Sequence, residues 1–195
     1  KNGVLAAACG YDANGNRLTY SDGSGTVSGT YDAEDRLTQL GTTVYDYSAN
    51  GELLSRTQGG SVTSYGYDPF GNLTSVHLPG GRQVDYVLDA RLRRIGKKVD
   101  GVLVQGFLYS GKLTVVAELD SAGNVVSRFV YATRRHVPDY LVRDGRAYLI
   151  VGDHLGSPRL VVDAATGDVA QRMDYDLFGN VTLDTNPGFQ PFGFA

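Results

Sequence analysis

The sequence predicts an all-β protein, a curled antiparallel sheet of hairpins, on three observations. Gly accounts for 26 of the 195 residues, and the acidic residues are 18 Asp against only 3 Glu. A short turn motif built on Asp and Gly recurs along the chain. The residues between its copies alternate with period two, as in Val84-Asp85-Tyr86-Val87-Leu88. Asp, Gly and Asn favour turns, while the helix formers Glu, Lys and Met are scarce, which argues against a helical bundle.

The motif is Tyr-Asp, two further residues, Gly-Asn and then an apolar residue. Its fullest copies begin at Tyr67 and Tyr175, and a third begins at Tyr11. Shortened copies, copies without Tyr and degenerate starts are found at Tyr31, Tyr47, Tyr86, Tyr109, Leu119, Tyr131 and Val162. The spacing of roughly 20 residues predicts a repeated unit of two strands and two turns, as in repeat arrays.

Each residue type in the motif has a physical role. Tyr ends one strand, and the following Asp accepts hydrogen bonds from its own backbone two residues on. Gly supplies a positive φ, so we expect Gly15, Gly71 and Gly179 to lie in the left-handed region within hairpin turns. Successive units pair edge to edge. The open edges of such a sheet need neighbouring repeats, another copy or a larger shell to cover them.

Three segments depart from the pattern. Residues 4–9 are apolar and fit a helical turn or the entry into a strand at Tyr11. Residues 132–139 are charged, contain Pro138 and predict a loop or a short helical turn. The segment 184–195 is rich in Pro, Gly and Phe, and we expect its rings to pack on the end of the sheet. The domain prediction is therefore a repeat sheet over 1–183 and a tail over 184–195.

Charge and composition exclude several classes of protein. The net charge is −3, which gives no basic footprint for nucleic acid, and the basic cluster at 91–98 is interpreted as the solvated face of a strand pair. Cys9 is the only cysteine, so no internal disulfide is possible. The longest apolar runs are too short to span a membrane, and the first residues lack a secretory signal pattern.

The candidate sites for chemistry are weak, and we assign no catalytic, cofactor-binding or metal-binding residue. Asp12, Asn14 and Asn16 alternate like calcium ligands, but other copies do not keep them, so turn chemistry is favoured. Asp153, His154 and Ser157 are triad residue types without a nucleophile elbow, and packing or hydrogen bonding is favoured for His154. Three alternatives remain. A zinc site would have to use the scattered residues His77, His136, His154 and Cys9. The Gly-rich segments would have to form a phosphate loop, and the Tyr residues would have to form sugar-binding platforms.

These Tyr-Asp and Gly-Asn units resemble the YD repeats of bacterial Rhs proteins, wall-associated proteins, toxin-complex C components and teneurins. The run Asp153-His154-Leu155-Gly156-Ser157-Pro158-Arg159-Leu160 is similar to a segment ahead of the Rhs repeat-associated core. The unit beginning at Tyr175 and the closing run 191–195 are similar to the residues that lead into that core.

The resemblance implies part of a hollow shell that encloses a C-terminal toxic domain, and no enzymatic activity or cofactor. It implies as partners the remaining repeats, the enclosed toxin and secretion-system components, but no nucleic acid and no membrane span. It also implies a bacterial protein, secreted or on the cell surface, used in interbacterial competition. The alternatives are a cell-surface module that binds glycans or a partner cell, and a fragment of a self-cleaving core. The core's self-cleavage motif has no counterpart in this sequence, so no protease residue is assigned.

Overall fold

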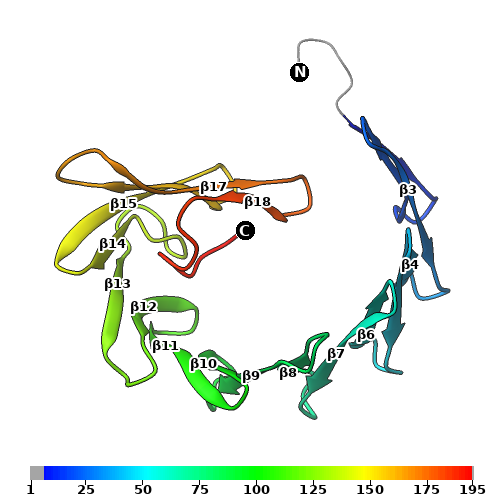
Figure 1. The fold of residues 1–195 in the computed structure, drawn as a ribbon, viewed down its shortest axis with the longest axis horizontal. Coiled ribbons are helices and arrows are strands. Elements are labelled where there is room, and N and C mark those ends of the chain that lie inside the picture. The colour runs from blue at the N-terminus through cyan, green and yellow to red at the C-terminus, as the bar shows by residue number, and fades with distance from the viewer. Residues whose placement is uncertain (1–6, 195) are drawn as a thin grey trace. The chain divides into compact units, whose positions relative to one another are not determined.

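The computed structural model describes residues 7–194, and these form 18 β-strands and no helix (Figure 1). The predicted fold class, an all-β antiparallel sheet of hairpins, is confirmed. Contacts divide the described chain into two compact units. Unit 1 comprises residues 7–86 and 99–101, and unit 2 comprises residues 87–98 and 102–194.

The strands of unit 1 are β1 (Ala7–Tyr11), β2 (Arg17–Asp22), β3 (Gly25–Tyr31), β4 (Leu37–Leu40), β5 (Thr43–Tyr47), β6 (Leu53–Gln58), β7 (Ser61–Tyr67) and β8 (Leu73–His77). Two strands contain residues of both units, β9 (Gln83–Leu88) and β10 (Arg94–Val99). The strands of unit 2 are β11 (Val102–Ser110), β12 (Thr114–Leu119), β13 (Val125–Val130), β14 (Tyr140–Arg143), β15 (Arg146–Gly152), β16 (Pro158–Asp163), β17 (Val169–Tyr175) and β18 (Val181–Asp184).

Consecutive strands pair antiparallel, from β1 to β9 in unit 1 and from β11 to β18 in unit 2. The pairing register shifts by one residue beside the Tyr of the motif, at Tyr11, Tyr31, Tyr47, Tyr67 and Tyr175. A β-bulge re-aims the side chain of the residue at which it occurs. The Tyr that ends each strand is therefore set apart from the regular alternation of its strand.

Glycine conformation in the motif turns follows the prediction. Gly15, Gly71 and Gly179 have φ of 89°, 78° and 83°, positive values that residues with a Cβ rarely adopt. The other hairpin ends include a tighter turn. Asp100 and Gly101 both have positive φ (50° and 81°), as type I′ hairpin turns require. The hairpins of the described chain are therefore closed by two kinds of turn, a longer Asp-based turn and a short one.

Apolar burial differs between the two units. In unit 2, Phe129, Leu141, Ile150 and Val161 form a buried core cluster, with Phe189 and Phe192 among the residues packed against it. In the described part of unit 1 only Val76 and Val84 are buried apolar side chains. The sheet of unit 1 therefore places most of its apolar side chains at half-buried or exposed positions.

The structure tests the predictions for the three segments that depart from the repeat pattern. Residues 7–9 belong to strand β1, as strand entry predicted, while residues 4–6 lie outside the described residues. Residues 132–139 form a loop without a helical turn. The expected packing of the tail rings on the end of the sheet needs correction. The rings of 189–194 contact β13, β15 and β17, because a face of several strands offers rings more apolar surface than an edge.

Candidate functional site

The motif turn is a closed hydrogen-bonded loop centred on its Asp. The carboxylate Oδ1 of Asp12 accepts the backbone N–H of Asn14 at 2.9 Å and of Asn16 at 2.8 Å. The N–H of Asp12 donates to the carbonyl of Asn16, and the N–H of Gly15 donates to the carbonyl of Asp12. The side-chain amide of Asn16 donates to the second carboxylate oxygen at 3.0 Å. Asp therefore satisfies backbone groups that the turn would otherwise leave to water.

The same pair of backbone hydrogen bonds recurs in nine turns of the described chain, which begin at Asp12, Asp32, Ser48, Asp68, Leu78, Asp89, Asp120, Asp153 and Asp176. The hydroxyl of Ser48 replaces the carboxylate, and Leu78 forms the turn with its backbone alone. At the fourth position Asp35 and Leu92 take a φ of 59° in place of Gly. The backbone geometry of the turn is therefore more widespread than its sequence motif.

Hydrogen bonds to the turn carboxylates lower their pKa. For Asp89 the hydrogen bond from the Arg93 guanidinium, followed by the N–H groups of Arg93 and Arg91, lowers the pKa to about 2. For Asp12 the side chain of Asn16 is the main cause of a lowered pKa. The backbone N–H of Asn72 does most to lower the pKa of Asp68. These groups are charged throughout the neutral range because they accept several N–H donors at once.

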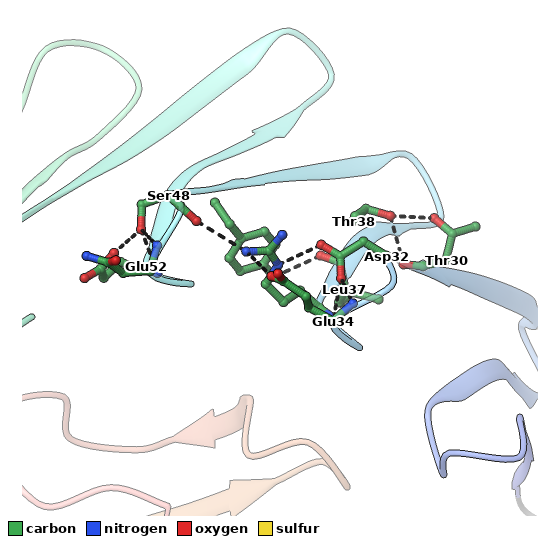
Figure 2. A network of polar contacts seen from close by, with 10 residues as sticks. Thr30, Asp32, Glu34, Leu37, Thr38, Ser48 and Glu52 are labelled. Carbon is green, nitrogen blue, oxygen red and sulfur yellow. Dashed lines mark hydrogen bonds and ion pairs between the residues drawn. The ribbon is translucent and has the colours of Figure 1, made fainter.

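Side chains also join one turn to the next in unit 1 (Figure 2). The guanidinium of Arg36 lies 2.7 Å from the carboxylate of Asp32 and 2.8 Å from that of Glu34, and it donates to the carbonyl of Ser48 at 3.3 Å. It also lies 5.5 Å from the centre of the Tyr47 ring, where a cation–π contact forms. Arg36 thus connects its own turn to the turn that follows Tyr47.

The Tyr hydroxyl makes a second connection at the same place. Tyr47 donates to the carbonyl of Leu37 at 2.9 Å, and Tyr31 donates to the carbonyl of Arg17 at 3.2 Å. In each case the acceptor is the first residue of the strand that leaves the preceding motif turn. The carboxylate of Asp35 receives the side-chain amides of Asn14 and Asn16, so the first two turns are joined as well. A ladder of polar contacts therefore runs from turn to turn in unit 1.

Unit 2 contains the same construction around Arg93. Its guanidinium lies 2.6 Å from Asp89 and 4.9 Å from the centre of the Tyr109 ring, and it donates to the carbonyl of Gly111 at 2.5 Å. The Tyr109 hydroxyl donates to the carbonyl of Arg94 at 2.8 Å. Arg93 therefore fixes the turn at 89–93 against the tip of the β11–β12 hairpin.

The C-terminal segment crosses one face of unit 2, and Figure 1 shows it in red beside β17 and β18. Three edge-to-face ring pairs hold it: Phe192 lies 4.8 Å from Phe129, and Phe189 lies 5.1 Å from Tyr148. The third pair joins Phe194 and Tyr175 at 5.5 Å. Rings from three strands thus receive three rings of the segment, which buries apolar area and adds pairwise contact energy.

Polar contacts fix the position of this segment along the sheet. Arg143 donates to the carbonyl of Phe189 at 2.7 Å and lies 5.3 Å from the centre of its ring. Gln190 is buried, and its amide donates to the carbonyl of Phe192 at 2.9 Å and accepts the N–H of the same residue at 2.6 Å. The segment is therefore seated in one register by directional bonds as well as by its rings.

Residues 2–195 match the family model described as Teneurin YD-shell. The chain belongs to the teneurin YD-shell family. The recognised resemblance to YD-repeat proteins is thereby confirmed. Because the match extends over both units, the turns and the C-terminal segment described above are all part of the YD-shell.

The relatives of this YD-shell chain include Teneurin-4 of Mus musculus, 30% identical over 185 residues, and Teneurin-1 of Gallus gallus, 27% identical over 186 residues. Each alignment covers 92% of this chain but only 6% and 7% of the respective teneurin. Among solved structures, the chain resembles TcdB2-TccC3 with a TM-score of 0.46 and 12% identity, covering 90% of this chain and 13% of the other. The chain thus spans a small part of the proteins it matches.

The three triad residue types of this YD-shell sequence, Asp153, His154 and Ser157, have different surroundings in the structure. Oδ1 of Asp153 accepts the N–H groups of Leu155, Gly156 and Ser157 at 3.0 Å each, so the run 153–157 is another motif turn. Burial opposes this effect, yet these donors hold the pKa of Asp153 below its ordinary value. His154 is exposed, so the packing expected for it is wrong, while its hydrogen bonding stays a prediction.

The other candidate ligands also serve local structure or face solvent. His77, His136 and Cys9 are exposed, and within residues 7–194 no three His, Cys, Asp or Glu side chains are grouped as a metal site. The oxygens of Asp12 accept N–H donors, which confirms turn chemistry at this position. No helix in the described part of the chain is long and apolar enough to cross a membrane.

Two sequence interpretations of the YD-shell repeats need correction. Tyr86 does not begin a turn: strand β9 continues to Leu88, and the turn begins at Asp89. The basic cluster is only partly a strand face, because Arg91 and Arg93 belong to that turn and β10 begins at Arg94. The missed signal was an Asp followed four residues later by a hydrogen-bonding residue such as Arg93 or Ser157. Gly is dispensable there, since Leu92 takes the positive φ.

Proposed function

We propose that this YD-shell segment is part of a wall that encloses a C-terminal toxic domain of the same parent protein. The observation that carries the proposal is the seating of residues 189–194 on one face of unit 2. A sheet that binds the chain following its own last strand is suited to hold a downstream segment against that same face. Enclosing a domain in this way requires no catalytic group.

The turns supply what such a wall requires. Asp-centred loops satisfy backbone groups at the hairpin ends, and the Arg–Tyr connections fix successive hairpins to one another. The proposed role is therefore structural and not enzymatic. We further propose that the parent is exported or displayed on the cell surface, that a secretion system delivers it to competing bacteria, and that its partners are the remaining repeats and the enclosed domain.

Protease protection of the parent protein tests enclosure. The full parent, tagged downstream of this segment, is treated with trypsin and the lifetime of the downstream domain is followed. We expect the domain to survive in the parent and to be digested in a Leu141→Asp variant, whose wall has lost its core. Leu54→Asp, at an exposed position, is the matched control and should preserve protection. Equal digestion of the domain in the folded parent and in Leu141→Asp would contradict enclosure.

A second candidate function is a cell-surface module that binds glycans or a partner cell. It is favoured by identities of 27–30% to teneurins over 92% of this chain. Binding of the tagged parent to glycan arrays and to intact cells distinguishes the two functions. Saturable binding together with a protease-sensitive downstream domain would favour the surface module over the enclosing wall.

A further inference from the structure

Unit 2 contains three adjoining surface pockets that share lining residues and together form a groove, whose charge is opposite in sign to the net charge of the chain. Its first part, ≈ 490 Å³, lies between the turn at 91–94 and the hairpin tip at 112–113. A second part, ≈ 380 Å³, shares Arg94, Tyr109 and Val115 with the first and extends to Phe192. A third part shares Lys112 and Leu113 with the first and extends to the loop at 135–136.

The rims of this groove, which we call the basic groove, are cationic. The groove is lined by Arg91, Arg93, Arg94, Lys112 and Arg135, and no Asp or Glu lines it among the described residues. The whole chain has a net charge of −3. Arg93 is neutralised by Asp89, whereas no ion pair involves Arg91, Lys112 or Arg135 within residues 7–194. A local excess of positive charge on an acidic chain attracts an anionic partner.

The floor and tips of the basic groove are apolar. Leu113 is 65% exposed and Leu92 is 53% exposed, and Phe107, Val115 and Phe192 line the inner part. Both leucines lie at tips that Arg93 fastens together through its bond to the carbonyl of Gly111. The groove thus combines apolar contacts with cationic rims.

This combination favours a peptide over a nucleic acid. A single-stranded nucleic acid needs aromatic rings on which its bases can stack. Three rings line the groove, but the guanidinium of Arg93 already lies 4.9 Å from the centre of the Tyr109 ring, and Phe192 packs edge-to-face on Phe129. Phe107 is the one ring left for stacking among the described lining residues. We propose that the basic groove binds an acidic peptide segment that also carries apolar side chains. This inference does not depend on the enclosure proposed above.

Fluorescence anisotropy with the 195-residue chain tests this inference. The probe is a labelled 12-residue peptide that alternates Asp with Leu and Phe. One comparison peptide has Asn in place of Asp, and another has Ser in place of the apolar residues. We expect only the acidic apolar peptide to bind, and its affinity to fall as salt is raised. An oligothymidine and vesicles containing anionic lipid are run in parallel, and tighter binding of either one would overturn the peptide assignment.

Charge reversal locates the site. We expect Arg91→Glu and Lys112→Glu each to weaken binding several-fold and their combination to weaken it roughly tenfold or more. The matched control is Arg128→Glu on β13, exposed on the sheet face opposite Phe129, and it should leave the affinity unchanged. Circular dichroism confirms that each variant is folded. No binding of the acidic apolar peptide, or equal loss in the Arg128→Glu control, would overturn the proposal.

Discussion

The two units use the same turn but are stabilised differently. Unit 2 buries Phe129, Leu141, Ile150 and Val161 beneath the C-terminal segment. Unit 1 has two buried apolar side chains in its described part, Val76 and Val84, and a ladder of turn contacts through Arg36 and Tyr47. Hydrogen-bonded turns determine where a strand begins and ends, whereas apolar burial supplies most of the favourable free energy of folding. A repeat without a covering segment therefore depends more on its neighbours.

The largest difference between the units should come from the core of unit 2. Leu141 has no exposed surface, so Leu141→Ala should lower the free energy of unfolding by about 2–5 kcal/mol. Leu54 in unit 1 is 43% exposed, and Leu54→Ala should cost less than about 1 kcal/mol. Urea unfolding followed by circular dichroism measures both. Similar costs for the two variants would remove the distinction between the units.

The motif glycines Gly71 of unit 1 and Gly179 of unit 2 occupy the same position of the turn, so they allow a direct comparison of the two units. Val at Gly71 or Gly179 is forced into a positive φ, which costs about 1–3 kcal/mol. A Cβ at Gly179 would also lie 2.7 Å from the ring of Phe194, while the nearest atom at Gly71 is at an ordinary 3.7 Å. Gly179→Val should therefore lower the melting temperature more than Gly71→Val, and it should loosen the C-terminal segment. An equal loss of melting temperature in both variants would show that the Phe194 ring moves aside at no energetic cost.

Acid should weaken the turns of both units together. The folded pKa of Asp89 is about 2, below the value of roughly 4 in an unfolded chain. Its stabilising contribution is therefore complete above pH 4 and is lost as the pH falls from about 4 to 2. Asp12, Asp32 and Asp68 have lowered pKa values as well. Melting temperature measured against pH should fall over this range, and less steeply in an Asp89→Asn variant.

The smallest effect on stability is expected at His154, within the run 153–160 that carries the resemblance to Rhs proteins. His154 is exposed, so His154→Ala should change the free energy of unfolding by no more than about 0.5 kcal/mol. Asp153→Ala removes the acceptor of three N–H groups and should lower the melting temperature clearly. Differential scanning calorimetry of the two variants makes the comparison. A larger loss from His154→Ala would restore a structural role to the imidazole.

Local chemistry explains which features the sequence could predict. The Tyr-Asp and Gly-Asn copies at Tyr11, Tyr67 and Tyr175 predict strand ends and turns, because Asp and Gly act within five residues. The turns at Leu78 and Asp89 escaped prediction, because one is formed by backbone alone and the other places Leu92 where Gly is expected. Such tolerance depends on tertiary contacts, such as the bond from Arg93 to Gly111.

The groove and the seat of the C-terminal segment escaped prediction for a different reason. Arg93, Tyr109 and Lys112 are separated along the chain and come together only when hairpins pair in register. The rings of the tail were recognised, but a sequence does not state which strands receive them. Phe129, Tyr148 and Tyr175 become neighbours of the tail through the order of β13, β15 and β17.

Native-state hydrogen exchange of the 195-residue chain tests most directly the claim that the C-terminal segment stabilises unit 2 while turns organise unit 1. The account predicts slower exchange in β13–β17 than in β3–β6. It also predicts that Phe192→Ala accelerates exchange in β13–β17 alone, because Phe192 packs on Phe129. Uniform protection across both sets of strands, unchanged in Phe192→Ala, would contradict it.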